Sequence, residues 1–300
     1  MASLETRVTN IVFRNPVLPA AGPNVATGER MIAAIRGGAG GIVAKTVSVI
    51  PAKDPRPTIR KCGAGLLNCE TWSEASAESF LDAYRAIKRE GVPLIVSIGY
   101  SPDDVARLGK MLEREVAPDA IEFSTHYVGK SLDPLLEVAR ALRESVQIPI
   151  WMKVSPSTPN IEELAIRAAS YVDAFVAINS VGPALDFDIE TPHATLGSKN
   201  SFGWLSGPAI RPIALRIVSQ IASVQPKPVI GVGGIASGAD AIQFFMAGAS
   251  LVQVCTAAIL KGASVYGAIA DDMKTWLEKH GYASAEDIRG LFLKNLNNAK

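Results

Sequence analysis

Two kinds of apolar segment alternate along the chain, and this alternation constrains the fold more than any other feature. Short, nearly unbroken apolar runs rich in β-branched residues are typical of strands buried on both faces of a parallel sheet. Eight such runs lie at residues 17–21, 41–46, 93–99, 120–125, 149–154, 173–179, 228–234 and 251–256. Longer amphipathic segments, typical of helices, lie at 74–89, 105–116, 132–146, 163–172, 210–223, 238–249 and 265–280. Strand and helix in alternation predict a parallel (β/α)8 barrel, a TIM barrel.

The length and composition fit such a barrel and exclude several other classes. The chain has 300 residues and no linker, so we predict a single domain over residues 1–300 with a small N-terminal hairpin under the barrel floor. Its 30 Lys and Arg balance 29 Asp and Glu, which argues against a nucleic-acid partner. The three scattered cysteines fit neither a disulfide framework nor a common metal motif. With no secretory signal and no long apolar stretch, we expect a cytoplasmic protein without membrane contact.

Two connections, at residues 47–73 and 180–208, are longer than the others. Both follow predicted strands, so in a barrel they would lie at the carboxyl ends of the strands, where barrel enzymes have their active sites. Long loops in compact domains are usually lids or binding loops. Each carries a tryptophan, Trp72 and Trp204, and the alternative is surface padding with a buried anchor.

A glycine-rich segment, Gly231-Val-Gly-Gly-Ile-Ala-Ser-Gly238, follows the seventh predicted strand. Glycines allow close approach of the backbone to a ligand, and amides at a helix start can hold an anion. Barrels build phosphate sites from the loops after strands seven and eight, so we predict a phosphate cradle of Gly233, Gly234, Cys255 and Thr256. A Rossmann dinucleotide motif is disfavoured because no acidic residue lies between positions 241 and 270. A plain tight turn is the remaining alternative.

Lys45 and Lys153 stand at the ends of otherwise apolar strands, where a charge is costly to bury without a partner. Two cations beside small-residue strand exits suit an electron-rich ring with a phosphate tail, such as flavin mononucleotide (FMN). Two structural salt bridges are the simpler alternative. A flavin-free aldolase or isomerase would instead use one of these lysines as a Schiff-base or acid/base residue.

The chain resembles the class 1 dihydroorotate dehydrogenases and the related dihydropyrimidine dehydrogenase domain over nearly its whole length. The matching segments are Phe13-Arg-Asn-Pro-Val-Leu-Pro-Ala-Ala-Gly22, Val43-Ala-Lys45-Thr46, Leu67-Asn68, Met152-Lys153-Val, Ile178-Asn179-Ser180-Val-Gly182, Phe202-Gly203-x-x-Ser206-Gly207-x-x-Ile210-x-Pro212, Ile230-Gly-Val-Gly-Gly-Ile-x-Ser-Gly238-x-Asp240-Ala and Gly248-Ala-x-x-Val-Gln253-x-x-Thr256.

The resemblance implies an FMN enzyme that transfers hydride between a C–C bond next to a carbonyl and flavin N5, converting dihydroorotate to orotate in pyrimidine biosynthesis. The implied cofactor contacts are Ala20, Ala21, Gly22, Lys45, Thr46, Lys153, Asn179, Ser180, Ser206, Gly207, Gly233, Gly234, Cys255 and Thr256. Asn68, Asn179 and Ser180 would contact substrate. Relatives are commonly homodimers, and class 1B relatives use a separate iron–sulfur electron-transfer subunit, which would be another polypeptide here.

The chain departs from the family on the loop after the fourth strand. The family pattern Asn-x-Ser-Cys-Pro-Asn supplies a catalytic cysteine, and Thr125 stands at that position with His126 beside it. A threonine hydroxyl needs a neighbour to accept its proton, and the pKa range of histidine suits that task. We therefore predict that Thr125 or His126 handles the proton, with Lys45 as a further member of the catalytic group.

Glu122 and Tyr127 replace two substrate-binding asparagines of the family, and Glu70 and Trp72 lie on a divergent segment after Asn68. All four are candidate substrate contacts. A buried glutamate repels the carboxylate of orotate unless Glu122 is protonated, pairs with Lys45 or points elsewhere. The alternative is a divergent enzyme acting on a non-carboxylated unsaturated ring or enoyl compound.

Overall fold

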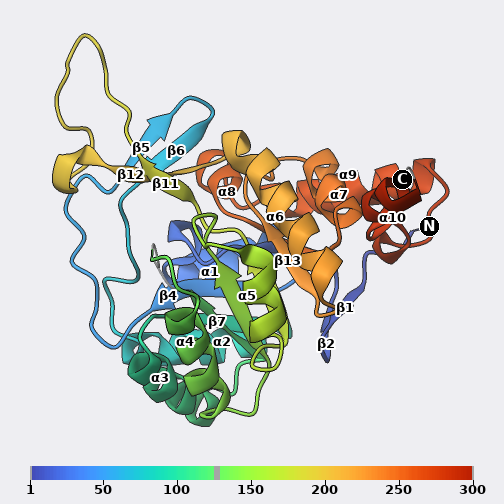
Figure 1. Ribbon diagram of the computed structural model, residues 1–300, viewed down its shortest axis with the longest axis horizontal. Helices are drawn as coiled ribbons and strands as arrows, with labels where there is room; N and C mark the ends of the chain where they lie inside the picture. The colour runs from blue at the N-terminus through green and yellow to red at the C-terminus, as the bar shows by residue number, and fades with distance from the viewer. Residues whose placement is uncertain (1, 125–128, 299–300) are drawn as a thin grey trace.

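Eight parallel strands curl into a nearly closed barrel in the computed structural model, which describes residues 2–124 and 129–298 (Figure 1). The strands are β3 (Val17–Pro19), β4 (Ile42–Val47), β7 (Leu94–Ile98), β8 (Ala120–Ser124), β9 (Ile150–Val154), β10 (Ala174–Ala177), β13 (Val229–Val232) and β14 (Ala249–Val254). Their order in the sheet is β3-β14-β13-β10-β9-β8-β7-β4. Across the seam between β3 and β4, the Gly40 N–H donates to the Val17 carbonyl at 2.9 Å. The predicted TIM barrel is confirmed, and each strand overlaps a predicted apolar run.

Helices connect the strands and cover the outside of the barrel (Figure 1). They are α1 (Gly28–Arg36), α2 (Leu81–Arg89), α3 (Pro102–Glu115), α4 (Asp133–Arg143), α5 (Ile161–Ala168), α6 (Arg211–Val224), α7 (Gly238–Met246), α8 (Thr256–Lys261), α9 (Val265–Lys279) and α10 (Leu291–Asn298). Short 3-10 turns lie at Pro23–Val25, Glu78–Phe80, Lys199–Ser201, Pro208–Ile210 and Ala285–Ile288. No helix in the described part of the chain is long and apolar enough to span a bilayer.

One predicted helix begins later than expected, and three observed helices, α1, α8 and α10, were not predicted. The helix expected at residues 74–89 begins only at Leu81, because Ser73 and Ser76 hold the preceding segment in turns by accepting bonds from nearby backbone N–H groups. The first α-helix, α1, lies where no helical segment was predicted. Thr27 caps it by accepting a bond from the Arg30 N–H.

The N-terminal hairpin closes the end of the barrel at which the strands begin. Its strands β1 (Thr6–Val8) and β2 (Ile11–Phe13) pair antiparallel, as expected. Val8, Ile11 and Phe13 are buried in one apolar cluster with Trp151, and the Phe13 and Trp151 rings have their centroids 6.3 Å apart. The lower half of the barrel interior is therefore filled with apolar side chains.

The two long connections pair with each other to form a second, four-stranded antiparallel sheet. Its strands β5 (Ile59–Cys62), β6 (Gly65–Asn68), β11 (Val181–Ala184) and β12 (Gly203–Ser206) are arranged in the order β11-β12-β6-β5. In Figure 1 this sheet extends away from the barrel, and a long loop, residues 185–198, projects beyond it. The sequence predicts long loops here, and the pairing of β6 with β12 gives them regular structure instead.

Candidate functional site

A cavity of about 330 Å³ lies at the carboxyl ends of the barrel strands, between the barrel and the second sheet. Its walls contain every residue expected to hold the cofactor: Ala20, Ala21, Gly22, Lys45, Thr46, Lys153, Asn179, Ser180, Ser206, Gly207, Gly233, Gly234, Cys255 and Thr256. Asn68, Glu70 and Trp72, expected to contact substrate, line the same cavity. Parallel strands end at one edge, so residues far apart in the sequence converge there.

One end of the cavity is a cradle of backbone. Gly207 and Gly234 have positive φ angles of 102° and 78°, which side-chain-bearing residues rarely adopt. A Cβ at Gly207 would lie 2.7 Å from Gly65 Cα, and one at Gly234 would lie 2.8 Å from the Gly207 carbonyl oxygen. The Thr256 hydroxyl donates to Ser206 Oγ at 2.8 Å and joins the barrel to the second sheet.

The glycine-rich loop is fastened at its far end by the buried carboxylate of Asp240. This carboxylate accepts bonds from the Ala236 N–H at 3.0 Å and the Ser237 hydroxyl at 2.9 Å, and it pairs with Arg211. These bonds within the chain therefore fix the shape of the loop. Lys261 also lines the cavity here and donates to the Ala236 carbonyl at 3.2 Å.

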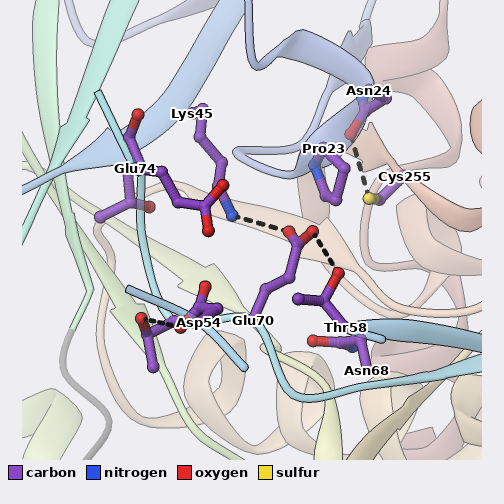
Figure 2. A network of polar contacts seen from close by, with 12 residues as sticks. Pro23, Asn24, Lys45, Asp54, Thr58, Asn68, Glu70, Glu74 and Cys255 are labelled. Carbon is purple, nitrogen blue, oxygen red and sulfur yellow. Dashed lines mark hydrogen bonds and ion pairs between the residues drawn. The ribbon is translucent and has the colours of Figure 1, made fainter. Parts of the chain in front are cut away.

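Lys45 is paired with Glu70 across the cavity (Figure 2). The Lys45 ammonium lies 3.2 Å from Glu70 Oε2, and the Thr58 hydroxyl donates to Glu70 Oε1 at 3.2 Å. The two charged side chains are only 9% and 18% exposed, so the pair is largely sheltered from water. Glu70 comes from the second sheet region, which therefore contributes a charge to the floor built by the barrel.

Lys153 is paired with Glu122. The distance from Lys153 Nζ to Glu122 Oε1 is 3.5 Å, and Glu122 Oε2 accepts a bond from Gln253 Nε2 at 2.8 Å. Glu122 itself does not line the cavity; it is buried one layer below. The suggested pairing of Glu122 with Lys45 is wrong. Lys45 forms its ion pair with Glu70, and Glu122 forms one with Lys153 on the adjacent strand.

Both cavity lysines therefore form the salt bridges that were the simpler alternative, yet both also face the cavity. Salt bridging and a role toward a ligand are compatible here, since each lysine retains donors beyond the one directed at its carboxylate.

The neutral polar groups of the cavity hold one another in place. Asn68 Nδ2 donates to the Trp204 carbonyl at 3.0 Å, and Asn179 Nδ2 donates to Ser124 Oγ at 3.3 Å. The Ser180 N–H donates to Asn179 Oδ1 at 2.8 Å. Trp72 donates from its indole to the Ile50 carbonyl at 3.1 Å, and its ring lies 4.5 Å from that of Tyr100.

Cys255 lies in the cavity wall beside Gly22 and directs its thiol toward Asn24 Oδ1, 3.0 Å away (Figure 2). Burial raises the pKa of this thiol to about 11. The thiol therefore stays protonated at neutral pH, which fits a packing role and disfavours a nucleophilic one. Asn24 in turn donates to the Tyr266 hydroxyl at 2.9 Å.

Three predicted site residues, Thr125, His126 and Tyr127, lie outside the described residues. The residue before them, Ser124, is buried and lines the cavity. Sequence reasoning missed Ser124, Gln253 and Lys261 as cavity residues. The first two could have been found from strand alternation, because Ser124 and Gln253 share the inward-facing parity of Glu122 and Leu251 on their strands. Within residues 2–124 and 129–298, no group of three or more His, Cys, Asp or Glu side chains could hold a metal ion.

Comparison with known proteins places these observations in a family. The sequence model of dihydroorotate dehydrogenase matches residues 3–277. Similar proteins include three named dihydroorotate dehydrogenase B (NAD(+)), catalytic subunit. The one from Pyrococcus abyssi is 37% identical, over 97% of this chain and 99% of the relative. Those from Pyrococcus furiosus and Methanothermobacter thermautotrophicus are each 34% identical, over 97% and 96% of this chain and 99% and 98% of the relatives.

Proposed function

The chain belongs to the dihydroorotate dehydrogenase family, and from this we propose that it oxidises dihydroorotate to orotate on a bound FMN. The observation that carries the proposal is the cavity at the barrel mouth. It combines a glycine-walled cradle at one end with two lysines on its floor and the amides of Asn68 and Asn179 beside them.

The residues present fit a phosphorylated, electron-rich ring. At Gly207 and Gly234 neighbouring protein atoms leave no room for a Cβ, so the cradle presents backbone rather than side chains, which suits close approach of a phosphate to backbone amides. Thr256 and Ser206 add hydroxyl groups there, and Lys45 and Lys153 add ammonium donors elsewhere in the cavity wall. The other expected contacts, among them Ala20 to Gly22, Asn179 and Ser180, also line the cavity.

When bound, the flavin supplies the acceptor for the hydride that leaves the substrate. Lys45 and Lys153 would stabilise negative charge that develops on a ring bound in the cavity, because their ammonium groups are held by carboxylate partners before reaction and are largely shielded from water. Asn68 and Asn179 orient the substrate through amide hydrogen bonds, and Glu70 and Trp72 form the wall contributed by the second sheet region. The proton is taken by Thr125 or His126.

An anaerobic titration with dihydroorotate tests the proposed reaction. Purified protein is expected to carry FMN, and its oxidised absorbance band is expected to bleach at stoichiometric substrate. A band that dithionite bleaches but dihydroorotate does not would discard the substrate and retain the cofactor. Colourless protein that binds no added FMN, with borohydride trapping at Lys45 or Lys153, would discard the flavin as well.

A double substitution, Thr125→Ala with His126→Ala, tests the proton-transfer step. General acid–base catalysis contributes about 10²–10⁴-fold, so we expect bleaching by dihydroorotate to slow by at least about 100-fold. Ser131→Ala is the matched control, because Ser131 lies on the same connection and its hydroxyl bonds to Asp133, donating to Oδ2 at 3.1 Å and accepting from the N–H at 3.2 Å. Unchanged bleaching in the double variant would remove both residues from the mechanism.

The charge arrangement favours a second candidate substrate class. Each lysine on the cavity floor already has a carboxylate partner, Glu70 or Glu122, so the four groups together carry no net charge. Such a floor disfavours the carboxylate of orotate relative to a neutral ring. Dihydrouracil in the same titration separates the two classes: bleaching by dihydrouracil alone would assign the neutral one.

The names of the relatives also support a proposal about partners. Because they are called catalytic subunits, we infer that electrons leave this chain through a separate electron-transfer subunit. We further propose a homodimer in the cytoplasm, and sedimentation of the purified chain tests its oligomeric state. Reoxidation of the reduced flavin by NAD⁺ without any other protein would contradict the separate subunit.

A further inference from the structure

Glu122 is a fully buried carboxylate whose role the proposed reaction does not assign. It sits in the middle of β8, and its side chain is 0% exposed. Its register partner on β9 is Trp151, which belongs to the apolar cluster inside the barrel. A charge in such surroundings is costly unless it is paired and hydrogen-bonded, so its two partners define what it does.

Both partners of Glu122 are side chains that reach the cavity. Lys153 and Gln253 line it, whereas Glu122 does not. Glu122 Oε1 is 3.5 Å from Lys153 Nζ and accepts no hydrogen bond within the described residues. Glu122 Oε2 takes the Gln253 amide N–H at 2.8 Å, which leaves Gln253 Oε1 without a described partner. Within the described residues, the polar contacts of this carboxylate that reach the cavity therefore run through Lys153 and Gln253.

Resting on the proposed flavin function, we propose that Glu122 is a positioning residue that sets the charge and the position of the Lys153 ammonium in the cavity that would hold the flavin. With Glu122 ionised, the buried pair presents no net charge. A neutral residue at this position leaves the full positive charge of Lys153 facing the cavity. Reduced flavin carries more negative charge than oxidised flavin, so the carboxylate lowers the reduction potential of the cofactor.

The test is the two-electron reduction potential of the bound flavin, measured by equilibration with a redox dye. Glu122→Gln keeps the size of the side chain and its bond to Gln253 while removing the charge. We expect the equilibrium constant for reduction to rise by about tenfold or more, which corresponds to about 30 mV. Asp119→Asn is the matched control, because Asp119 pairs with Lys88 at 3.1 Å in a half-buried position outside the cavity lining.

A second measurement shows whether the effect passes through Lys153. In a Lys153→Met background, Glu122→Gln is expected to change the potential by much less than in the wild-type background. Equal changes in both backgrounds, or an unchanged potential in Glu122→Gln with flavin retained, would overturn the proposal. If Glu122→Gln does not fold, Glu122→Asn is measured under the same criteria. Wild-type protein that binds no flavin would instead refute the proposed function, and this inference with it.

Discussion

Gly22 and Cys255 face each other across the cavity wall, and the structure gives a quantitative prediction for their contact. A Cβ built at Gly22 would lie 2.5 Å from Cys255 Sγ and 2.8 Å from Asn24 Oδ1. Gly22 has φ −131° and ψ −171°, an extended conformation that alanine adopts without strain. The cost of Gly22→Ala is therefore steric. Overpacking of this kind costs about 1–3 kcal/mol, so we expect the free energy of unfolding to fall by that amount and FMN to bind more weakly.

The same geometry predicts a suppressor. Cys255→Ala removes the sulfur, and the remaining Cβ would lie 3.8 Å from the new methyl group, an ordinary contact. The Asn24 oxygen is the end of a side chain and can turn once the thiol that it contacts is gone. By itself Cys255→Ala costs about 1–2 kcal/mol of buried packing. We expect the double variant to be no less stable than Cys255→Ala alone.

Urea denaturation of the wild type, both single variants and the double variant measures the coupling energy, and flavin fluorescence gives the affinity for FMN in parallel. Independent sites add within about 0.5 kcal/mol, whereas contacting residues couple by about 0.5–3 kcal/mol. Additive losses of stability would refute the view that the thiol is what excludes a side chain at Gly22.

Further substitutions test the cradle and the cavity charges. Asp240→Asn is expected to lower the free energy of unfolding by about 2 kcal/mol in urea denaturation, since charge-assisted bonds that hold the glycine-rich loop are lost. Lys261→Met is expected to weaken FMN binding by roughly twofold to fivefold, because an exposed charge contributes little. Riboflavin lacks the phosphate, so its binding should stay unchanged in the same fluorescence titration. Glu70→Gln frees Lys45 and is expected to lower the KM for dihydroorotate roughly fivefold without improving turnover of dihydrouracil. Burial raises the pKa of the Cys255 thiol from 9.0 to about 11, so as the pH rises the unfolded chain loses this proton before the folded chain does. The free energy of unfolding should therefore be unaffected below pH 9 and fall by at most about 3 kcal/mol between pH 9 and 11. Denaturation measured at a series of pH values should show this fall in the wild type and not in Cys255→Ala.

The barrel could be predicted from the sequence because its strands are buried on both faces and so stand out as continuous apolar runs. The second sheet could not. Its strands are only four residues long, three of them (β5, β11 and β12) are mostly half-buried, and β11 contains Pro183. Their pairing joins Leu66 to Ser206, 140 positions apart, and no local pattern encodes such a contact. Helix α1 was missed for a related reason: its apolar stripe is short and lies in a glycine-rich stretch.

Most of the residues expected at the site lie around one cavity because the carboxyl ends of parallel strands must converge. What the sequence left open was which lysine meets which carboxylate. Lys45 meets Glu70 only because the second sheet turns back over the barrel mouth, and the sequence did not predict that sheet.

The depth of Glu122 was nevertheless available from strand geometry. Residues two apart on a strand face the same side and lie about 6.6 Å apart along it. Ser124 is at the end of β8 and lines the cavity, so Glu122 shares its inward face but must lie one layer deeper, level with the interior of the barrel. A carboxylate at that depth does not contact a substrate in the cavity directly. It can only act on the groups above it, and the nearest cation on the adjacent strand is Lys153. Glu122, which replaces an asparagine of the family and was expected to repel an anionic substrate, therefore changes the charge of the cavity floor. That charge affects the binding of cofactor and substrate alike.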